Sequence, residues 1–178
     1  MYHFKLFLVI GYETIMSFIF SLPRFRLFIF FKVFFLRIMG AKIGKGVFIY
    51  PGVWIIPGKN LEIGNYVDLA KDVIITTGGG VSIGDRSLIG YRTQILSTNH
   101  SIPPIGFPFP VSGDSHSQII IGKDVWIGAN CIITAGVHIE DGAVIAAGSV
   151  VTKNVPSNSI YAGVPARLIK MRLPCKDL

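Results

Sequence analysis

Four histidines, at positions 3, 100, 116 and 138, are the side chains of this 178-residue chain best suited to acid–base chemistry. A neutral imidazole can accept a proton near neutral pH, as a general base must. His100 is the strongest candidate because it ends a regular segment and begins an irregular loop, where function commonly resides. The competing interpretation is a loop histidine hydrogen-bonded for structure. For His116, in the same loop, contact with a substrate and simple solvation are both open.

No metal centre or disulfide is expected. Histidines hold zinc only when the fold brings them together, and positions 100, 116 and 138 do not follow the 18-residue period described below. Of the two cysteines, Cys131 falls on an interior repeat position and Cys175 lies near the C-terminus, with no second motif nearby. A reduced compartment is therefore favoured.

The segments that must position these residues repeat every six positions. Between Ile119 and Pro156 an aliphatic residue stands at 121, 127, 133, 139, 145 and 151. A helix would space its apolar residues by three and four and a half-buried strand by two, so the pattern fits neither. The residue four places after each of these aliphatic residues is small or β-branched. In every six residues, the aliphatic position and this second position therefore face an interior. Such units bury their apolar face only by stacking, with three units to each triangular coil.

The same count extends back to residue 43 in three registers, each change adding two residues: Ile43, Ile49, Ile55 and Leu61; Ile63, Leu69, Ile75 and Val81; Ile83, Ile89 and Ile95. A glycine directly follows the apolar residue at 44, 64, 84, 122 and 128, where we expect backbone angles that glycine adopts most easily. The count fails over residues 97–118. Because the 38 residues from Ile83 to Ile121 equal two coils of 18 plus two, part of one coil is predicted to be an irregular loop.

The repeat resembles that of the hexapeptide-repeat acyltransferases. Three segments carry the narrower likeness: IGDRSLIGYRTQILSTNH at 83–100, IGKDVWIGANCIITAGV at 121–137 and AAGSVVTKNVPSNSIYAGVPARLIK at 146–170. They are similar to the branch of maltose, galactoside, serine, capsule and lipopolysaccharide acetyltransferases. The resemblance implies an all-β fold, a left-handed parallel β-helix of hexapeptide repeats over 41–172, with an N-terminal α-helical appendage over 1–40 and a tail over 173–178. It also implies acetyl transfer from acetyl-CoA, as co-substrate, to a hydroxyl.

The same resemblance assigns roles to individual positions. His100 corresponds to the catalytic base, whose orienting partner no sequence signal identifies, and Asn99 and Trp126 are placed beside the acceptor. Donor binding is expected at Ala129, whose backbone would lie at the thioester, at Ala147 and Gly148 beside the pantetheine arm, and at Thr152, Lys153, Arg167 and Lys170 near the nucleotide. For each residue expected near the nucleotide, the competing interpretation is an ordinary exposed side chain. For Trp126 it is packing at a subunit interface. Because the family places its site between subunits, a homotrimer is expected.

The acceptor stays open. Maltose-type and galactoside-type relatives carry an Asn near Ala70 and an acidic residue near Gly78, so their sugar contacts do not transfer to this chain. The apolar loop residues Ile105, Phe107 and Phe109 suit a glycan or lipid-linked glycan as well as a small sugar. The prediction is O-acetylation of a sugar in a surface polysaccharide such as capsule or lipopolysaccharide. The alternatives are N-acetylation of a nucleotide-linked aminosugar and a noncatalytic β-helix scaffold.

The net charge of +7 is concentrated at the N-terminus, where residues 1–46 hold seven cationic side chains and one acidic residue. The repeat region is nearly neutral and shows no base-reading or stacking motif, so no nucleic-acid partner is expected. Residues 4–39 contain ten Phe and predict two helices separated at 21–23, where Pro23 disfavours helix in the preceding residue. Charges at Glu13, Lys32 and Arg37 argue against bilayer spans, and no small-residue cleavage site suggests a signal peptide.

Two interpretations of residues 1–40 are open. The helices can pack on the open end of the coil, as N-terminal caps do in solenoids, or on each other in an oligomer. Alternatively they form an interfacial anchor, with aromatic rings at the headgroup boundary and cations at anionic lipid. Both interpretations can hold together. The expected location is the cytoplasm, in the second case in peripheral contact with the inner face of the cell membrane.

Overall fold

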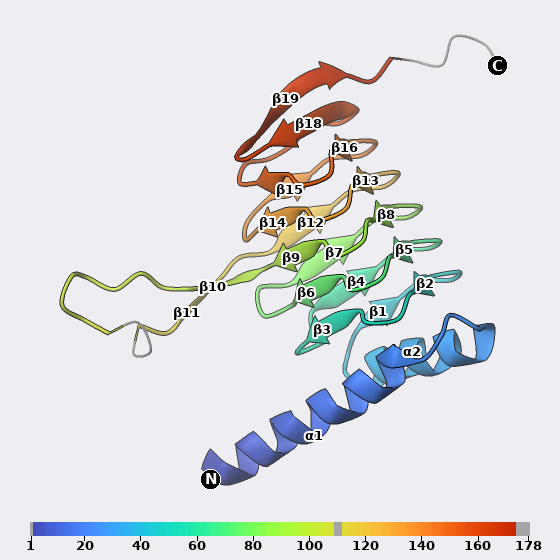
Figure 1. Cartoon of the computed structure of the whole chain (residues 1–178), viewed down its shortest axis with the longest axis vertical. Helices are drawn as coiled ribbons and strands as arrows, with labels where there is room; N and C mark the ends of the chain where they lie inside the picture. The colour runs from blue at the N-terminus through green and yellow to red at the C-terminus, as the bar shows by residue number, and fades with distance from the viewer. Residues whose placement is uncertain (1, 109–111, 174–178) are drawn as a thin grey trace.

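The computed structural model describes residues 2–108 and 112–173, so Phe109, Cys175 and the predicted tail beyond residue 173 lie outside the described residues. The repeat region forms a parallel β-helix of short strands on three sides (Figure 1). This is the predicted fold class, with two N-terminal helices, α1 (Tyr2–Ser21) and α2 (Arg26–Ile38), at one end of the coil.

Each side of the coil is one parallel sheet, except for the last strand. Sheet A contains β1 (Lys42–Ile43), β4 (Leu61–Ile63), β7 (Val81–Ile83), β12 (Ile119–Ile121) and β15 (His138–Ile139). Sheet B contains β2 (Phe48–Ile49), β5 (Asp68–Leu69), β8 (Leu88–Ile89), β13 (Trp126–Ile127), β16 (Val144–Ile145), β18 (Ser159–Gly163) and the antiparallel β19 (Ala166–Met171). Sheet C contains β3 (Trp54–Ile56), β6 (Ile74–Thr76), β9 (Gln94–Leu96), β14 (Ile132–Thr134) and β17 (Val150–Val151).

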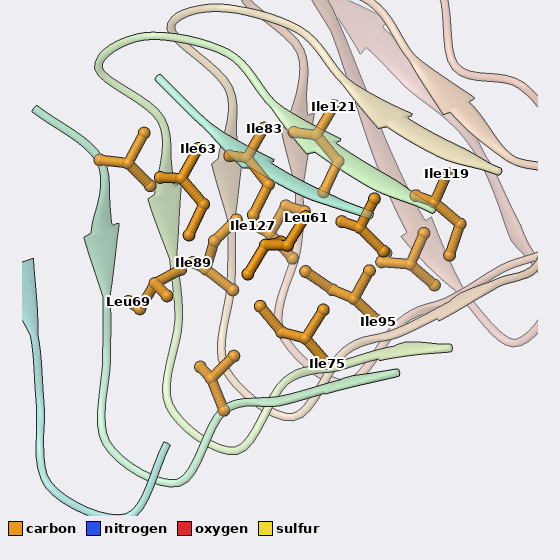
Figure 2. Packing of buried hydrophobic residues seen from close by; sticks show 14 of the residues in the cluster. Leu61, Ile63, Leu69, Ile75, Ile83, Ile89, Ile95, Ile119, Ile121 and Ile127 are labelled. Carbon is orange, nitrogen blue, oxygen red and sulfur yellow. The ribbon is translucent and has the colours of Figure 1, made fainter. Parts of the chain in front are cut away.

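The aliphatic residues of the six-residue count form the core. Ile43 pairs with Ile63, and Ile83 with both Ile63 and Ile121, so equivalent residues of successive coils lie directly above one another. Figure 2 shows the resulting stacks of Ile and Leu side chains inside the coil. The second interior positions are buried as predicted, at Val125, Cys131, Val137, Ala143, Ser149 and Val155. The repeat therefore stabilises the coil mainly by removing aliphatic surface from water.

The predicted reason for the corner glycines is wrong. Gly44, Gly84 and Gly128 are not among the residues with positive φ. Their role is steric, because a Cβ on Gly44 would lie 2.5 Å from the backbone oxygen of Gly64 in the next coil. Corners of neighbouring coils thus stack backbone on backbone, which only glycine permits.

The prediction that the 38 residues from Ile83 to Ile121 span two coils is also wrong. Strand β12 pairs directly with β7, so these residues form one coil and not two. The surplus leaves the coil as an antiparallel hairpin of β10 (Thr98–His100) and β11 (Asp114–His116), which projects sideways in Figure 1. The hairpin closes at its base, where the amide of Ser117 donates to the carbonyl of Ser97 at 3.1 Å.

The two helices cover the first coil. Met16, Phe20 and Leu36 are buried in the same core cluster as the coil's aliphatic residues. The Tyr12 hydroxyl donates to the Ile55 carbonyl at 2.8 Å. Burial, with a smaller contribution from Glu13, raises the pKa of Tyr12 to about 12. These contacts satisfy the capping interpretation of the appendage.

Lys32 is the one fully buried cation among the described residues. Its Nζ donates to the carbonyl oxygens of Leu22 at 2.8 Å and Ile49 at 3.1 Å, which ties the link between the helices to the coil. Burial lowers the pKa of Lys32 to about 8. Over the described residues, neither helix has the length and apolar character needed to cross a bilayer, as the sequence predicts.

Candidate active site

His100 lies at the outer end of β10, on the hairpin that leaves the corner between sheets C and A (Figure 1). The hairpin approaches the preceding coil closely. A Cβ on Gly79 would lie 2.5 Å from the Ser97 oxygen and 2.6 Å from the Ser117 nitrogen. Glycine at 79 therefore lets the base of the hairpin seat against the coil, which fixes where His100 leaves it.

The structure pairs His100 with Asp114, a contact that the sequence could not identify. The two residues are directly opposite in the antiparallel ladder, and Nδ1 of His100 lies 2.8 Å from Oδ1 of Asp114. A carboxylate on Nδ1 holds the imidazole with Nε2 directed away and able to accept a proton. The His100 side chain is 83% exposed in the single chain, so a substrate can reach it. The pair has the arrangement of a general base and the group that orients it.

A second cross-strand pair lies one step nearer the coil on the same face of the hairpin. Thr98 Oγ1 and His116 Nδ1 are 3.2 Å apart. A Cβ on Gly78 would lie 2.4 Å from Thr98 Oγ1 and 3.0 Å from His116 Nδ1. The space beside position 78, where the resembling family carries an acidic residue, is thus filled here by this pair. The structure therefore gives a physical reason for the departure at Gly78.

Asn99 is the predicted acceptor contact beside His100. Because successive side chains of a strand alternate between faces, Asn99 lies on the opposite face of the hairpin from His100. Its backbone oxygen accepts a hydrogen bond from the Ser115 hydroxyl at 3.3 Å. The side chains of Asn99 and His100 therefore lie on opposite sides of the hairpin within one chain.

The predicted donor residues Ala129, Ala147 and Gly148 come together at the corner between sheets B and C. Ala129 lies between β13 and β14, and the other two lie between β16 and β17, one coil further on. The amide of Gly148 donates to the carbonyl of Ala129 at 2.8 Å. Ala147 and Gly148 are exposed, so this corner presents backbone and small side chains to a ligand.

The other predicted donor residues lie toward the C-terminal end of the coil. Thr152 and Lys153 directly follow β17, at the corner between sheets C and A, and both are exposed. Arg167 and Lys170 are exposed on β19, the last strand of sheet B. Four polar or cationic side chains at one end of the coil suit the phosphates of a nucleotide.

Trp126 stands on the outer surface of sheet B and is 56% exposed. It pairs in register with Leu88 on one side and Val144 on the other. His100, by contrast, leaves the corner between sheets C and A. In the single chain β13, which holds Trp126, leads into the small-residue corner, whereas β10, which holds His100, leaves a different corner (Figure 1).

Cys131 is not suited to nucleophilic chemistry. It is fully buried, and burial raises the pKa of its thiol although nearby backbone amides oppose the shift. Its Sγ lies 3.1 Å from the Ala146 carbonyl. Across residues 2–108 and 112–173, no three His, Cys, Asp or Glu side chains gather as a metal ion would require.

Comparisons with known proteins identify the family that this chain resembles. Residues 118–153 match the model of the hexapeptide repeat of succinyl-transferase. The galactoside O-acetyltransferase of Escherichia coli is 37% identical over 133 residues, which are 74% of this chain and 64% of that protein. An Escherichia coli protein named as a colanic acid biosynthesis acetyltransferase is 34% identical over 142 residues, or 80% of this chain and 75% of that protein.

A solved structure agrees with the sequence matches. The hexapeptide-repeat acetyltransferase of Vibrio cholerae O1 biovar eltor, in complex with acetyl coenzyme A, superposes with a TM-score of 0.79 at 26% identity. The match covers 92% of this chain and 87% of that one. At that coverage the likeness extends beyond the coil into the N-terminal helical segment.

Proposed function

This chain belongs to the hexapeptide-repeat acetyltransferases, in the branch of the galactoside and maltose enzymes, and on that premise we propose that it transfers acetyl from acetyl-CoA to a sugar hydroxyl. The observation that carries the proposal is the 2.8 Å contact between His100 and Asp114 on the projecting hairpin. A base with an orienting carboxylate is the machinery that attack by a hydroxyl requires.

The proposed reaction is a direct transfer. Nε2 of His100 removes the acceptor's hydroxyl proton as the oxygen attacks the thioester carbonyl. The new C–O bond forms, the C–S bond of acetyl-CoA breaks, and the proton passes from His100 to the departing sulfur. Asp114 stabilises the imidazolium formed between these steps. Backbone N–H groups near Ala129 are proposed to stabilise the oxyanion of the tetrahedral intermediate.

We place the complete site between protomers of a homotrimer. In one chain His100 leaves one corner of the coil while Ala129, Ala147 and Gly148 lie at another, with sheet C between them. A closed cyclic assembly lets the hairpin of one protomer reach the small-residue corner of its neighbour. The exposed apolar side chains of Phe48, Leu88 and Trp126 on sheet B supply a surface suited to such contact.

The proposed acceptor is a sugar unit of a surface polysaccharide. Support comes from the likeness to the colanic acid biosynthesis relative, which extends over 75% of that protein. The exposed residues Ile102, Ile105 and Phe107 line the far part of the hairpin and offer apolar contact to the ring faces of a glycan.

The test is acetyl transfer from isotopically labelled acetyl-CoA to a panel of galactosides, maltose, polysaccharide repeat units and nucleotide-linked aminosugars, read by mass spectrometry. We expect an O-linked acetyl on a sugar or glycan, formed about a hundredfold or more slowly with His100→Ala. An acetyl found on an amine alone would replace the O-transfer proposal with N-transfer. If the wild type binds no acetyl-CoA and acetylates nothing, the noncatalytic scaffold is the better account.

A further inference from the structure

The helices α1 and α2 are apolar on both faces, although capping the coil uses only one. Met16 and Phe20 of α1 are buried against the coil, and so are Lys32 and Leu36 of α2. At 3.6 residues per turn, a residue midway between two buried residues four apart lies on the opposite side of the helix. That rule places Phe18 and Phe34 on the outer surface.

The outer surface is built from large apolar side chains. Phe18 is 70% exposed and Phe34 is 53% exposed. Around them α2 presents Leu27, Phe30, Phe31 and Ile38, and α1 presents Phe7 and Ile10, all of them exposed. These eight residues are named the outer aromatic face. A helix that is apolar all round is normally covered on both sides, so something other than the coil covers this face.

Cations border the outer aromatic face. Arg26 lies on α2 and lines, together with Phe30 and Phe48, a hollow of about 490 Å³ between that helix and the first coil. Arg37 is exposed at the C-terminal end of α2, where its guanidinium donates to the Ile43 carbonyl at 2.6 Å, and Lys45 follows it.

Residues 1–46 carry seven cations and one acidic side chain. Lys32 is buried and Lys42 is paired with Glu62 at 2.6 Å, so five cations remain against the single acidic residue, Glu13. The end of the molecule that is apolar is thus also the end that is positive.

We propose that the outer aromatic face docks on the surface of an anionic phospholipid bilayer. Aromatic and aliphatic side chains would enter the boundary between headgroups and acyl chains, while Arg26 and the neighbouring cations meet the headgroups. The helices lie on the membrane and do not span it, which agrees with their length and charge over the described residues. The coil and its projecting hairpin then stand out from the membrane surface (Figure 1).

Charge decides between a bilayer and a second copy of the chain. Two copies joined through this face would bring two strongly positive N-terminal ends together, which is unfavourable. An anionic surface neutralises the same cations and covers the same aromatic side chains. The proposal does not depend on acetyl transfer, because docking is measured without acetyl-CoA.

The experiment is co-sedimentation of the full chain with vesicles of phosphatidylcholine alone or mixed with phosphatidylglycerol, at low and high salt. The wild type should bind the mixed vesicles at low salt and dissociate at high salt. The double variant Phe31→Ser/Phe34→Ser should bind about a hundredfold more weakly, since each phenyl ring removed costs about tenfold or more. Arg26→Gln should weaken binding about fivefold.

Matched controls carry the same changes elsewhere. Phe107→Ser removes an exposed ring from the hairpin, and Lys123→Gln removes an exposed cation from a distant corner. Both should bind as the wild type does, and thermal unfolding checks that all variants are folded. The proposal is overturned if the wild type ignores anionic vesicles at low salt, or if the control variants lose as much binding as the face variants. It is equally overturned if Phe31→Ser/Phe34→Ser leaves vesicle binding intact but lowers the mass of the lipid-free assembly, because a second copy would then cover the face.

Discussion

Asp114→Asn tests whether the hairpin holds a working base. The amide oxygen of Asn can still accept from Nδ1 of His100, so the geometry of the 2.8 Å contact is preserved while the negative charge is lost. What the variant removes is the stabilisation of the imidazolium by a neighbouring charge. Because attack and proton transfer coincide, this stabilisation acts on the transition state and should appear in kcat and not in KM for acetyl-CoA.

The expected loss of kcat in Asp114→Asn follows from how exposed the two side chains are. In the single chain the His100 side chain is 83% exposed and that of Asp114 is 46% exposed. Ion pairs this accessible to water contribute at most about 1 kcal/mol, which corresponds to about a fivefold loss of kcat. A loss of about a hundredfold or more would mean that the pair is desolvated in the working enzyme, by substrate or by a neighbouring protomer.

The assay is steady-state release of CoA at saturating acetyl-CoA, with the acceptor that the mass-spectrometric panel identifies. Ser115→Ala is the matched control, because Ser115 lies beside Asp114 on β11 and its hydroxyl donates to the Asn99 carbonyl at 3.3 Å, with no hydrogen bond to His100 or Asp114 among the described residues. This control should keep kcat, and Asp114→Glu should recover part of it. Unchanged kcat in Asp114→Asn, or an equal loss in Ser115→Ala, would refute the orienting role.

Three further predictions concern the coil, the cap and the donor site. Gly44→Ala should lower the free energy of unfolding by about 1–3 kcal/mol, since its Cβ would lie 2.5 Å from a backbone oxygen of the next coil. Its matched control is Gly11→Ala in α1, where the added Cβ meets nothing within 4 Å outside its own helix backbone, and this variant should raise that free energy by about 0.5–1 kcal/mol in the same denaturant titration. Burial lowers the pKa of Lys32 from its ordinary 10.5 to about 8. The unfolded state therefore binds more protons between these two values, and the free energy of unfolding should rise from about pH 8 to about pH 10 in the wild type but not in Lys32→Gln. Arg167→Gln should raise the dissociation constant for CoA about tenfold by calorimetry, while Lys123→Gln leaves it unchanged; equal effects of the two would remove Arg167 from the donor site.

The sequence predicts the coil well because its information is periodic. An aliphatic residue every sixth position is a local signal, and the pairing of Ile63 with Ile83 and of Ile121 with Ile139 confirms the predicted register. The two wrong predictions, the reason for the corner glycines and the number of coils between Ile83 and Ile121, concern contacts in space that a periodic pattern does not encode. Whether Gly44 serves a backbone angle or a close approach depends on what stacks above it, and both explanations give the same residue in the sequence.

Asp114 shows where sequence reasoning stops. It is separated from His100 by a loop without periodicity, so no spacing rule relates the two residues. The pairing depends on the antiparallel register of β10 and β11, which is set where Ser97 and Ser117 meet at the base of the hairpin. An acidic residue in the return limb of a loop that must close would have been the signal to seek. The assignments of Ala129, Trp126 and Arg167 remain predictions that depend on how protomers assemble.

The central claim is that His100 is the base of an acetyl transfer from acetyl-CoA, and turnover of His100→Ala tests it most directly. The measurement is kcat for CoA release at saturating acetyl-CoA and acceptor, together with the calorimetric dissociation constant for CoA. We predict that kcat falls about a hundredfold or more, the scale of a positioned general base, while the dissociation constant and the unfolding temperature stay at their wild-type values. A variant that turns over as fast as the wild type would contradict the account.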